Sequence, residues 1–242
     1  AVAAIRFHGV TGDLVPVLQW RWQRPSPTSL AEPAKPPLDE TLTQDDPFTN
    51  HWPQFLGPHR NCKVEQPRLA RDWKAQPPHR LWLRQVGPAW SGFAVAGRRA
   101  ITQEQQGGNE TGTCYDTASG APLWSHADPA HFQSPLAGEG PRSTPTIAGG
   151  RLYALGSTGI LSCLDLETGK PLWSKDILRD NDAKLNEWGM SGSPLLVDDL
   201  VVVSAGGHAN RSLVAYRAAT GEFVWGASTD GAGYSSPCLV TL

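Results

Sequence analysis

The sequence has no adjacent cysteines and no C-x-x-C pair, which excludes the common signatures of structural zinc sites and dithiol redox centres. Its four cysteines lie singly between Cys62 and Cys238. The seven histidines are also isolated, and His126 and His131, five residues apart in one segment, match no recognised metal spacing. Neither a phosphate-binding glycine loop nor a nucleophile elbow occurs. We therefore expect no metal site from these motifs.

An excess of basic residues and a long apolar run are absent as well. Lys and Arg number 21 against 23 acidic residues, so the net charge is only −2 and no nucleic-acid partner is expected. The apolar run at residues 1–5 is far shorter than the roughly 20 residues that cross a bilayer, so we expect no membrane span. The chain neither opens with Met nor shows the order of a signal peptide, so we expect a signal or an anchor to precede Ala1.

Tryptophan, glycine and proline are abundant instead. Ten Trp, 25 Gly and 21 Pro combine many tight turns with large flat side chains that pack between the elements those turns connect. Hydrophobic residues make up 39% of the chain, enough for a core. This composition favours an all-β fold.

Composition also divides the chain into three parts. Six prolines between residues 24 and 50 favour extended, solvated backbone, so we interpret residues 1–50 as a Pro-rich linker. Residues 51–79 begin with aromatics among turn formers and are expected to be a lead-in segment that docks on the domain surface. The domain itself is predicted over residues 80–242.

From residue 80 onward the sequence repeats itself, which is a stronger signal than any local propensity. The motif is small-x-D-x-x-[ST]-G-x-x-x-W. Its copies contain Cys114, Asp116, Ser119, Gly120 and Trp124, then Cys163, Asp165, Thr168, Gly169 and Trp173, then Ala215, Thr220, Gly221 and Trp225. Only Arg217, in place of Asp, departs from the motif.

A second landmark, which we call the serine-proline slot, recurs out of phase with the first. Its copies start at Ser91, where the proline is missing, and at Ser143, Gly192 and Ser235. The spacings are 52, 49 and 43 residues, close to the about 40 to 50 residues of a propeller blade. Two-residue turn candidates follow the first three slots at Gly97-Arg98, Gly149-Gly150 and Asp198-Asp199. Each unit should therefore hold four short strands.

These spacings predict an all-β β-propeller of four-stranded antiparallel blades. We count three complete blades and two partial ones, because Trp82 marks an orphan outer strand and the chain stops at Leu242, inside the first strand of a further blade. Closed propellers use about four to eight blades, so the chain is expected to be an open arc from a longer protein with a ring of about seven or eight.

Each motif residue has an expected physical role. The Asp carboxylate should accept backbone N–H bonds while the Gly supplies the positive φ that closes the turn. The Trp that follows should lie on the outer strand and pack against the neighbouring blade. Small residues before the turn, Cys114 and Cys163, should be buried under such a ring, and Cys238 should be buried in an apolar strand at 237–240.

The copies at 114–124 and 163–173 resemble the tryptophan-docking repeat of pyrroloquinoline-quinone (PQQ)-dependent dehydrogenases and their non-catalytic relatives, which include the outer-membrane assembly lipoprotein. Residues 52–58, W-P-Q-F-L-G-P, resemble the W-P-Q-F-R-G-P lead-in of exported bacterial propellers, with Leu56 in place of Arg. The resemblance implies a periplasmic or cell-surface location. Catalytic members carry a vicinal Cys-Cys disulfide beside the quinone, and this sequence has none.

Binding residues are expected on the long loops 125–142, 174–191 and 226–234, which should crown one face. The equivalent loop ends are Trp90, Arg142, Ser191 and Tyr234, which should face a common funnel, and Glu139, Glu187 and Trp188 lie in the same loops. The rings and the guanidinium would hold a planar anion. Alternatively, Arg142 only bonds to loop carbonyls and Trp90 only caps the channel.

Three functions remain open at this point. We expect an exported, non-catalytic scaffold that binds envelope proteins or a small ligand. The resemblance leaves a second function, a dehydrogenase of alcohols or sugars with PQQ and Ca²⁺ as cofactors, for which no catalytic residue is assigned. The third is a structural module whose blade edges bind peptides by strand addition.

Overall fold

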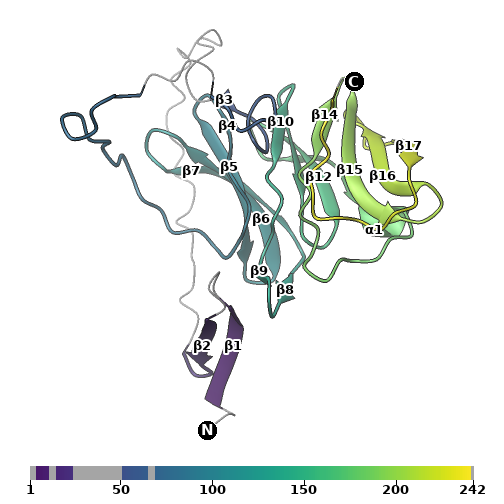
Figure 1. Ribbon diagram of the computed structural model, residues 1–242, viewed down its shortest axis with the longest axis horizontal. Helices are drawn as coiled ribbons and strands as arrows, with labels where there is room; N and C mark the ends of the chain where they lie inside the picture. The colour runs from purple at the N-terminus through teal and green to yellow at the C-terminus, as the bar shows by residue number, and fades with distance from the viewer. Residues whose placement is uncertain (1–3, 11–14, 24–50, 65–68, 241–242) are drawn as a thin grey trace.

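The computed structural model describes residues 4–10, 15–23, 51–64 and 69–240, and almost all of its regular structure is β-strand (Figure 1). Three antiparallel sheets follow one another along the chain, and we call them blades 1, 2 and 3. Blade 1 contains β4 (Ala94–Ala96), β5 (Arg99–Gln106), β6 (Asn109–Asp116) and β7 (Pro122–Asp128); blade 2 contains β10 (Thr146–Ala148), β11 (Arg151–Leu155), β12 (Ile160–Asp165) and β13 (Pro171–Asp176); blade 3 contains β14 (Leu195–Val197), β15 (Leu200–Gly207), β16 (Arg211–Arg217) and β17 (Phe223–Ala227). The predicted propeller blades are confirmed.

The first two strands of each blade are joined by the predicted two-residue turns. Gly149 and Gly150 both have positive φ, the geometry that matches the twist of a tight hairpin. Gly97 and Asp198 have positive φ in the other two turns, and Asp enters this region more readily than most residues. Turn chemistry in the sequence therefore fixes where each blade begins.

Long connections between the blades carry short elements of their own. These are β8 (Gln133–Ser134) and β9 (Gly138–Glu139), which pair between blades 1 and 2, and α1 (Ile177–Asp180), a single helical turn between blades 2 and 3. The loops begin later than predicted, because β7, β13 and β17 stay hydrogen-bonded to their neighbours as far as Asp128, Asp176 and Ala227.

The lead-in segment bonds to all three blades. β3 (His51–Trp52) pairs with β4 and adds a fifth strand to blade 1. The Pro53 carbonyl accepts a hydrogen bond of 2.7 Å from the N–H of Ile147 in blade 2. The buried Arg60 guanidinium donates to the carbonyls of Pro194, ahead of blade 3, and Pro237. These bonds hold the lead-in against the inner strands of the arc.

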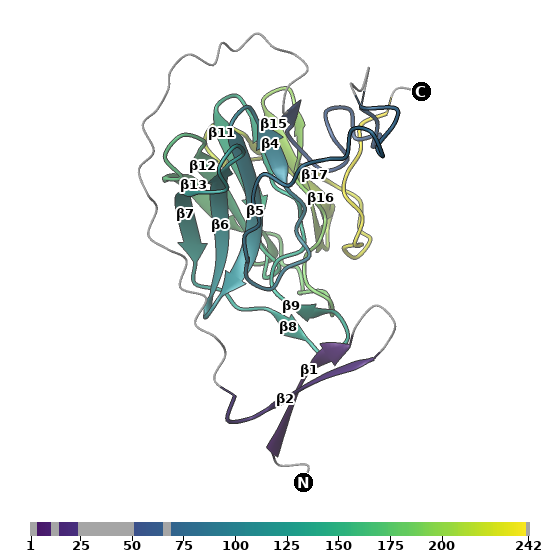
Figure 2. The same ribbon diagram turned by 90° about the vertical axis from the view of Figure 1, so that its left-hand side faces the viewer.

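A β-hairpin near the N-terminus corrects part of the linker interpretation. β1 (Ile5–Val10) and β2 (Pro16–Trp20) are antiparallel, and Figures 1 and 2 place them beside β8 and β9. The prolines behind the linker interpretation lie at 25 and beyond, so they said nothing of these strands. Residues 24–50 lie outside the described residues, and the domain boundaries stay a prediction.

Apolar cores fill the spaces between neighbouring blades. Ile101, Cys114, Trp124, Leu152 and Leu164 join blades 1 and 2, while Tyr153, Leu161, Cys163, Val201 and Val214 join blades 2 and 3. Burial raises the pKa of the Cys114 thiol to about 12 and that of Cys163 to about 11. Both are therefore small, unreactive core groups, and their predicted burial is confirmed.

Three local predictions outside the three blades are wrong. The residues around Trp82 form no strand, and neither do residues 237–240. Cys238, predicted to be buried, is exposed. The reason is that a strand needs a hydrogen-bonded neighbour, and neither segment has one among the described residues.

Candidate functional site

Three indole rings each contact the motif turn of the repeat unit that follows in the sequence. The ring nitrogens of Trp82, Trp124 and Trp173 donate to the carbonyls of Thr117, Leu166 and Ala218 at 2.9, 3.0 and 3.0 Å. Each ring also covers the motif glycine of that turn, Gly120, Gly169 or Gly221, where a Cβ atom would collide with it. Glycine is needed at these three positions for the ring contact as well as for its positive φ.

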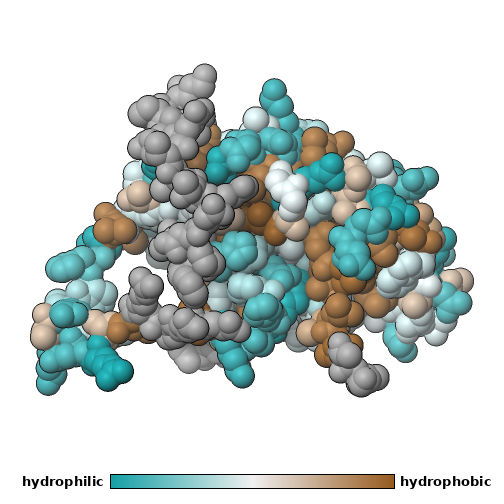
Figure 3. Space-filling view, turned by 90° about the horizontal axis from the view of Figure 1, so that it is seen from above, coloured by the Kyte–Doolittle hydropathy of each residue, from teal (hydrophilic) through white to brown (hydrophobic). Residues whose placement is uncertain are grey.

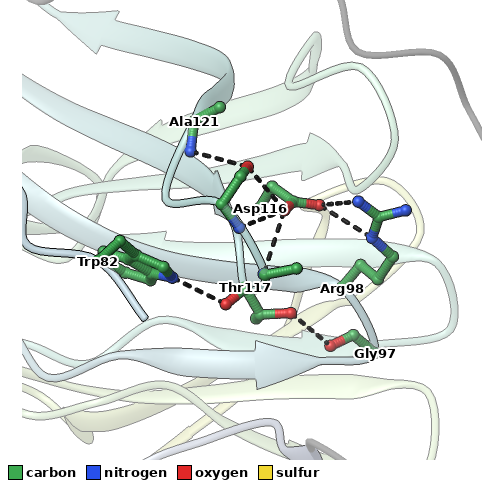
Figure 4. Close-up of polar contacts among 8 residues, drawn as sticks. Trp82, Gly97, Arg98, Asp116, Thr117 and Ala121 are labelled. Carbon is green, nitrogen blue, oxygen red and sulfur yellow. Dashed lines mark hydrogen bonds and ion pairs between the residues drawn. The ribbon is translucent and has the colours of Figure 1, made fainter. Parts of the chain in front are cut away.

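The turn that receives Trp82 is built around Asp116 (Figure 4). The Asp116 carboxylate accepts hydrogen bonds from the backbone N–H and hydroxyl of Ser119, both at 2.8 Å, and pairs with Arg98 at 2.7 Å. Burial alone would raise the pKa of Asp116, but the Ser119 and Arg98 bonds hold it below its ordinary value. In the next copy, bonds from Thr168 lower the pKa of Asp165.

The third copy keeps the turn without the Asp. Arg217 accepts a backbone bond from Gly221 at 2.8 Å, as Asp116 does from Gly120 at the same distance. Its guanidinium pairs with Asp199. This is the Arg98–Asp116 pair with the charges exchanged, so the departure from the motif preserves the interaction.

Hydroxyl groups join the blades at their inner ends. The N–H groups of Gly92, Thr144 and Ser193 donate to the hydroxyl oxygens of Thr144, Ser193 and Ser236 at 3.2, 2.9 and 2.9 Å. Each bond links one serine-proline slot to the next, which explains why a hydroxyl residue recurs there. Neighbouring blades are therefore held together by indole contacts at their outer strands and by hydroxyl hydrogen bonds at their inner ends.

A pocket of about 460 Å³ opens between the segment ahead of blade 1, the β8–β9 turn and the loop ahead of blade 3. Its walls are Trp90, Leu136, Ala137, Arg142, Trp188 and Ser191. A second hollow of about 390 Å³ shares Trp90 and Arg142 and continues toward Trp52 and Phe55 of the lead-in. We call the two together the aromatic groove.

Four of the predicted site residues lie in this groove, and a fifth adjoins it. Trp90, Arg142, Ser191 and Trp188 are wall residues. Tyr234 stacks on Trp188 with ring centroids 5.2 Å apart, and its carbonyl accepts a bond of 2.9 Å from the Ser191 hydroxyl. The equivalent loop ends therefore do meet, although Tyr234 supports the wall rather than lining it.

Arg142 is bound by its own loop. Its guanidinium donates to the carbonyls of Ala137 at 2.7 Å, Gly138 at 3.2 Å and Gly140, and lies 4.6 Å from the centre of the Phe132 ring. Burial lowers the pKa of Arg142. Of the two alternatives for this residue, the loop-carbonyl one describes its contacts.

The two predicted carboxylates are not among the wall residues. Glu139 lies on β9, 3.7 Å from the ring nitrogen of His131. Glu187 is exposed in the loop ahead of blade 3. Sequence reasoning missed Leu136 and Ala137, because nothing local distinguishes two apolar residues in a loop.

Glu110 on β6 is a buried carboxyl that sequence reasoning also missed. It is 4% exposed, and its Oε1 accepts a hydrogen bond of 3.1 Å from the N–H of Ser157 in blade 2. Its Oε2 has no partner among the described residues, and Asp128 lies directly opposite on β7. Burial raises the pKa of Glu110, bonds from Ser157 and Thr158 oppose the rise, and Asp128 adds to it.

We expect Glu110→Gln to remove part of the pH dependence of stability. A raised pKa means that the folded state binds this proton more tightly than the unfolded state does. The contribution is therefore complete below the ordinary glutamate pKa of about 4.3 and is lost as pH rises through the folded pKa. In urea unfolding, wild type should lose stability relative to Glu110→Gln between acidic and neutral pH. Glu187→Gln, at an exposed position, is the control. If the difference in unfolding free energy between wild type and Glu110→Gln were the same at every pH, the raised pKa of Glu110 would be refuted.

The described residues contain no cluster of metal-ligating side chains and no helix that could cross a membrane. In 4–10, 15–23, 51–64 and 69–240, no three His, Cys, Asp or Glu side chains gather as metal ligands would. Over the same ranges no helix is long and apolar enough to cross a membrane.

Four-stranded antiparallel blades joined by equivalent indole and hydroxyl contacts define a β-propeller repeat protein of the PQQ-like class. Residues 71–239 match the family model PQQ_2, described as outer membrane protein assembly factor BamB. The chain therefore belongs to this family.

The chain is also similar to individual proteins. Outer membrane protein assembly factor BamB of Xanthomonas campestris is 34% identical over 88 residues, 36% of this chain and 21% of that protein, so the chain aligns with about a fifth of the relative's length. The quinohemoprotein alcohol dehydrogenase of Comamonas testosteroni matches at 20% identity with a TM-score of 0.57, covering 74% of this chain and 27% of that one, a likeness of fold alone. BamB from Moraxella catarrhalis matches at 18% identity and a TM-score of 0.40, covering 60% and 50%.

Proposed function

We propose that this chain is part of a non-catalytic propeller scaffold of the bacterial envelope, periplasmic or at the cell surface, that binds outer-membrane assembly proteins through the aromatic groove. The observation that carries the proposal is the groove itself, where Trp90 and Trp188 face a common apolar pocket beside Tyr234. Half-exposed aromatic rings on a rigid scaffold are typical anchors for protein partners. Family membership supports the choice of partner.

The composition of the groove supports a scaffold over a quinone enzyme. A PQQ and Ca²⁺ site needs carboxylate or amide oxygens for the ion and a free cation for the quinone carboxylates. The wall residues include no carboxylate, and their one guanidinium is held by three loop carbonyls. The walls of the aromatic groove therefore do not fit that cofactor. In this proposal the contact between each indole ring and the next turn corresponds to a tryptophan-docking motif, which holds neighbouring blades together.

The test places a photo-crosslinking phenylalanine analogue at position 188 of the full-length protein in its own envelope. We expect cross-links to outer-membrane assembly proteins, and we expect Trp90→Ala in the same chain to weaken them about tenfold, the effect of losing one aromatic hot spot. The same analogue at position 73, another exposed Trp, is the matched control and should give none of these products.

A titration with PQQ and Ca²⁺, followed by quinone absorbance, tests the opposite outcome. Saturable binding with reduction of an acceptor dye would establish the dehydrogenase and overturn the scaffold proposal. Equal cross-linking from positions 188 and 73 would remove the groove as the partner site.

A further inference from the structure

The N-terminal hairpin has one apolar face. Directly paired residues of an antiparallel sheet point to the same side, and Ile5 pairs with Trp20 and Phe7 with Leu18. Trp22, just past β2, stacks on Trp20 with the ring centroids 5.3 Å apart and the planes 14° from parallel. Four aliphatic or aromatic side chains and a second indole therefore share one side of two short strands.

This face is uncovered in the part of the chain that the structure describes. Phe7, Leu18, Trp20 and Trp22 are 46%, 56%, 50% and 68% exposed. A two-stranded hairpin is marginal in water unless a face is packed against something. The hairpin touches the propeller at β9, and the aromatic side chains stay about half exposed in the presence of that contact.

The other face carries cationic and polar side chains, with Val17 beside Gln19 as an exposed apolar residue. Arg6 pairs with Gln19, and Arg21, whose N–H bonds to the Ala4 carbonyl at 2.8 Å, is two residues further along the same side as Gln19. All three side chains are exposed. In the sequence, residues 4–23 contain these two arginines and one carboxylate, that of Asp13, which leaves a formal charge of +1. The hairpin therefore has a local positive charge although the whole chain has a net charge of −2.

We infer that the hairpin is a peripheral lipid-binding element that lies flat on an anionic membrane surface. Its aromatic face enters the boundary between headgroups and acyl chains, where Trp side chains gather, and its arginines extend to lipid phosphates. The charge complementarity selects this occupant, because a purely apolar protein face would leave Arg6 and Arg21 without a role. Figure 1 shows the hairpin at the end of the molecule opposite β3 and β14, a position from which it can reach a surface.

Co-sedimentation of the full chain with sucrose-loaded vesicles tests this inference. We expect binding to vesicles containing phosphatidylglycerol, little binding to phosphatidylcholine alone, and weaker binding at high salt. The double variant Trp20→Ser/Trp22→Ser should lose about tenfold or more in affinity through lost apolar contact, and Arg6→Gln/Arg21→Gln should lose the preference for the anionic lipid.

Matched controls separate this result from unfolding and from the aromatic groove. Trp73→Ser removes an exposed Trp outside the hairpin and should bind vesicles as wild type does. Phe7→Ser should weaken binding while leaving the unfolding midpoint of the propeller unchanged. Absence of vesicle binding, or equal loss in the Trp73 control, would overturn the inference. So would hairpin variants that abolish self-association, because the face would then bind a second copy of the chain.

Discussion

Gly169→Ala should lower the free energy of unfolding by about 3 kcal/mol, because the alanine meets two costs at once. Gly169 has a φ of +67°, a region that L-residues enter at about 1 to 2 kcal/mol. Its new Cβ atom would also collide with the indole ring of Trp124, whose nearest atoms would lie within 3.0 Å of it. The ring has no free space to move into, since Trp124 is only 6% exposed.

Gly149→Ala is the matched control for this substitution. Gly149 has a similar φ of +55°, but a Cβ atom there would meet nothing within 4 Å. Its cost should be the backbone term alone, about 1 to 2 kcal/mol. Urea unfolding of the two variants measures the difference. Equal losses would show that the ring does not seal the junction between blades 1 and 2.

Trp124→Ala should be as damaging, with a loss of about 3 to 5 kcal/mol. The ring belongs to the core between blades 1 and 2, and its removal leaves a cavity over Gly169. The carbonyl of Leu166 also loses the hydrogen bond of 3.0 Å from the indole nitrogen. Trp124→Phe keeps most of the apolar contact, so its loss of buried area costs little. It should cost about 1 kcal/mol in addition, because the Leu166 carbonyl is left without its hydrogen-bond donor.

Trp225→Ala distinguishes the inter-blade contact from the tryptophan itself. Trp225 is the repeat equivalent on β17, but it is 36% exposed and its ring nitrogen donates to nothing among the described residues. Phe223 and Val224 of the same strand are also exposed, and Figure 3 shows hydrophobic patches on the surface of the molecule seen from above. Because about a third of Trp225 is already in water, its loss should cost about 2 kcal/mol by area, less than the loss of Trp124. A cost equal to that of Trp124 would mean that docking on the next turn contributes little.

The repeat made the blades predictable because the Asp, Ser or Thr and Gly of each motif build the turn within their own blade. The spacing of Asp116, Gly120 and Trp124 predicts a turn followed by the Trp on the outer strand. Three copies of the motif are too many to be a chance match. The exchanged ion pair could also have been predicted from the sequence. Arg98 and Asp116 are separated by 18 residues, and so are Asp199 and Arg217. Only the pairing of the turns revealed that these offsets mean contact.

Residues outside the repeat were harder to place. The equivalent loop ends predicted that Trp90, Arg142 and Ser191 would meet, because repetition implies a common side. Repetition did not imply that Arg142 would bind its own loop, which depends on how that loop folds. The predictions for Cys238 and for the N-terminal residues were wrong for a related reason. Burial and strand pairing both require a partner segment, and no local sequence pattern identifies that partner.

By itself the sequence determined the blade, its turns and the order of its strands, because these depend on glycine conformation, short hydrogen bonds and alternating side chains within about 45 residues. Tertiary structure decided which side chains meet across blades. Examples are the burial of Glu110 against Ser157, the hydrogen bond from Arg60 to the Pro237 carbonyl, and the walls of the aromatic groove. Those contacts join residues that are far apart in the chain, and their free energies depend on shape and burial that exist only once the blades are packed together.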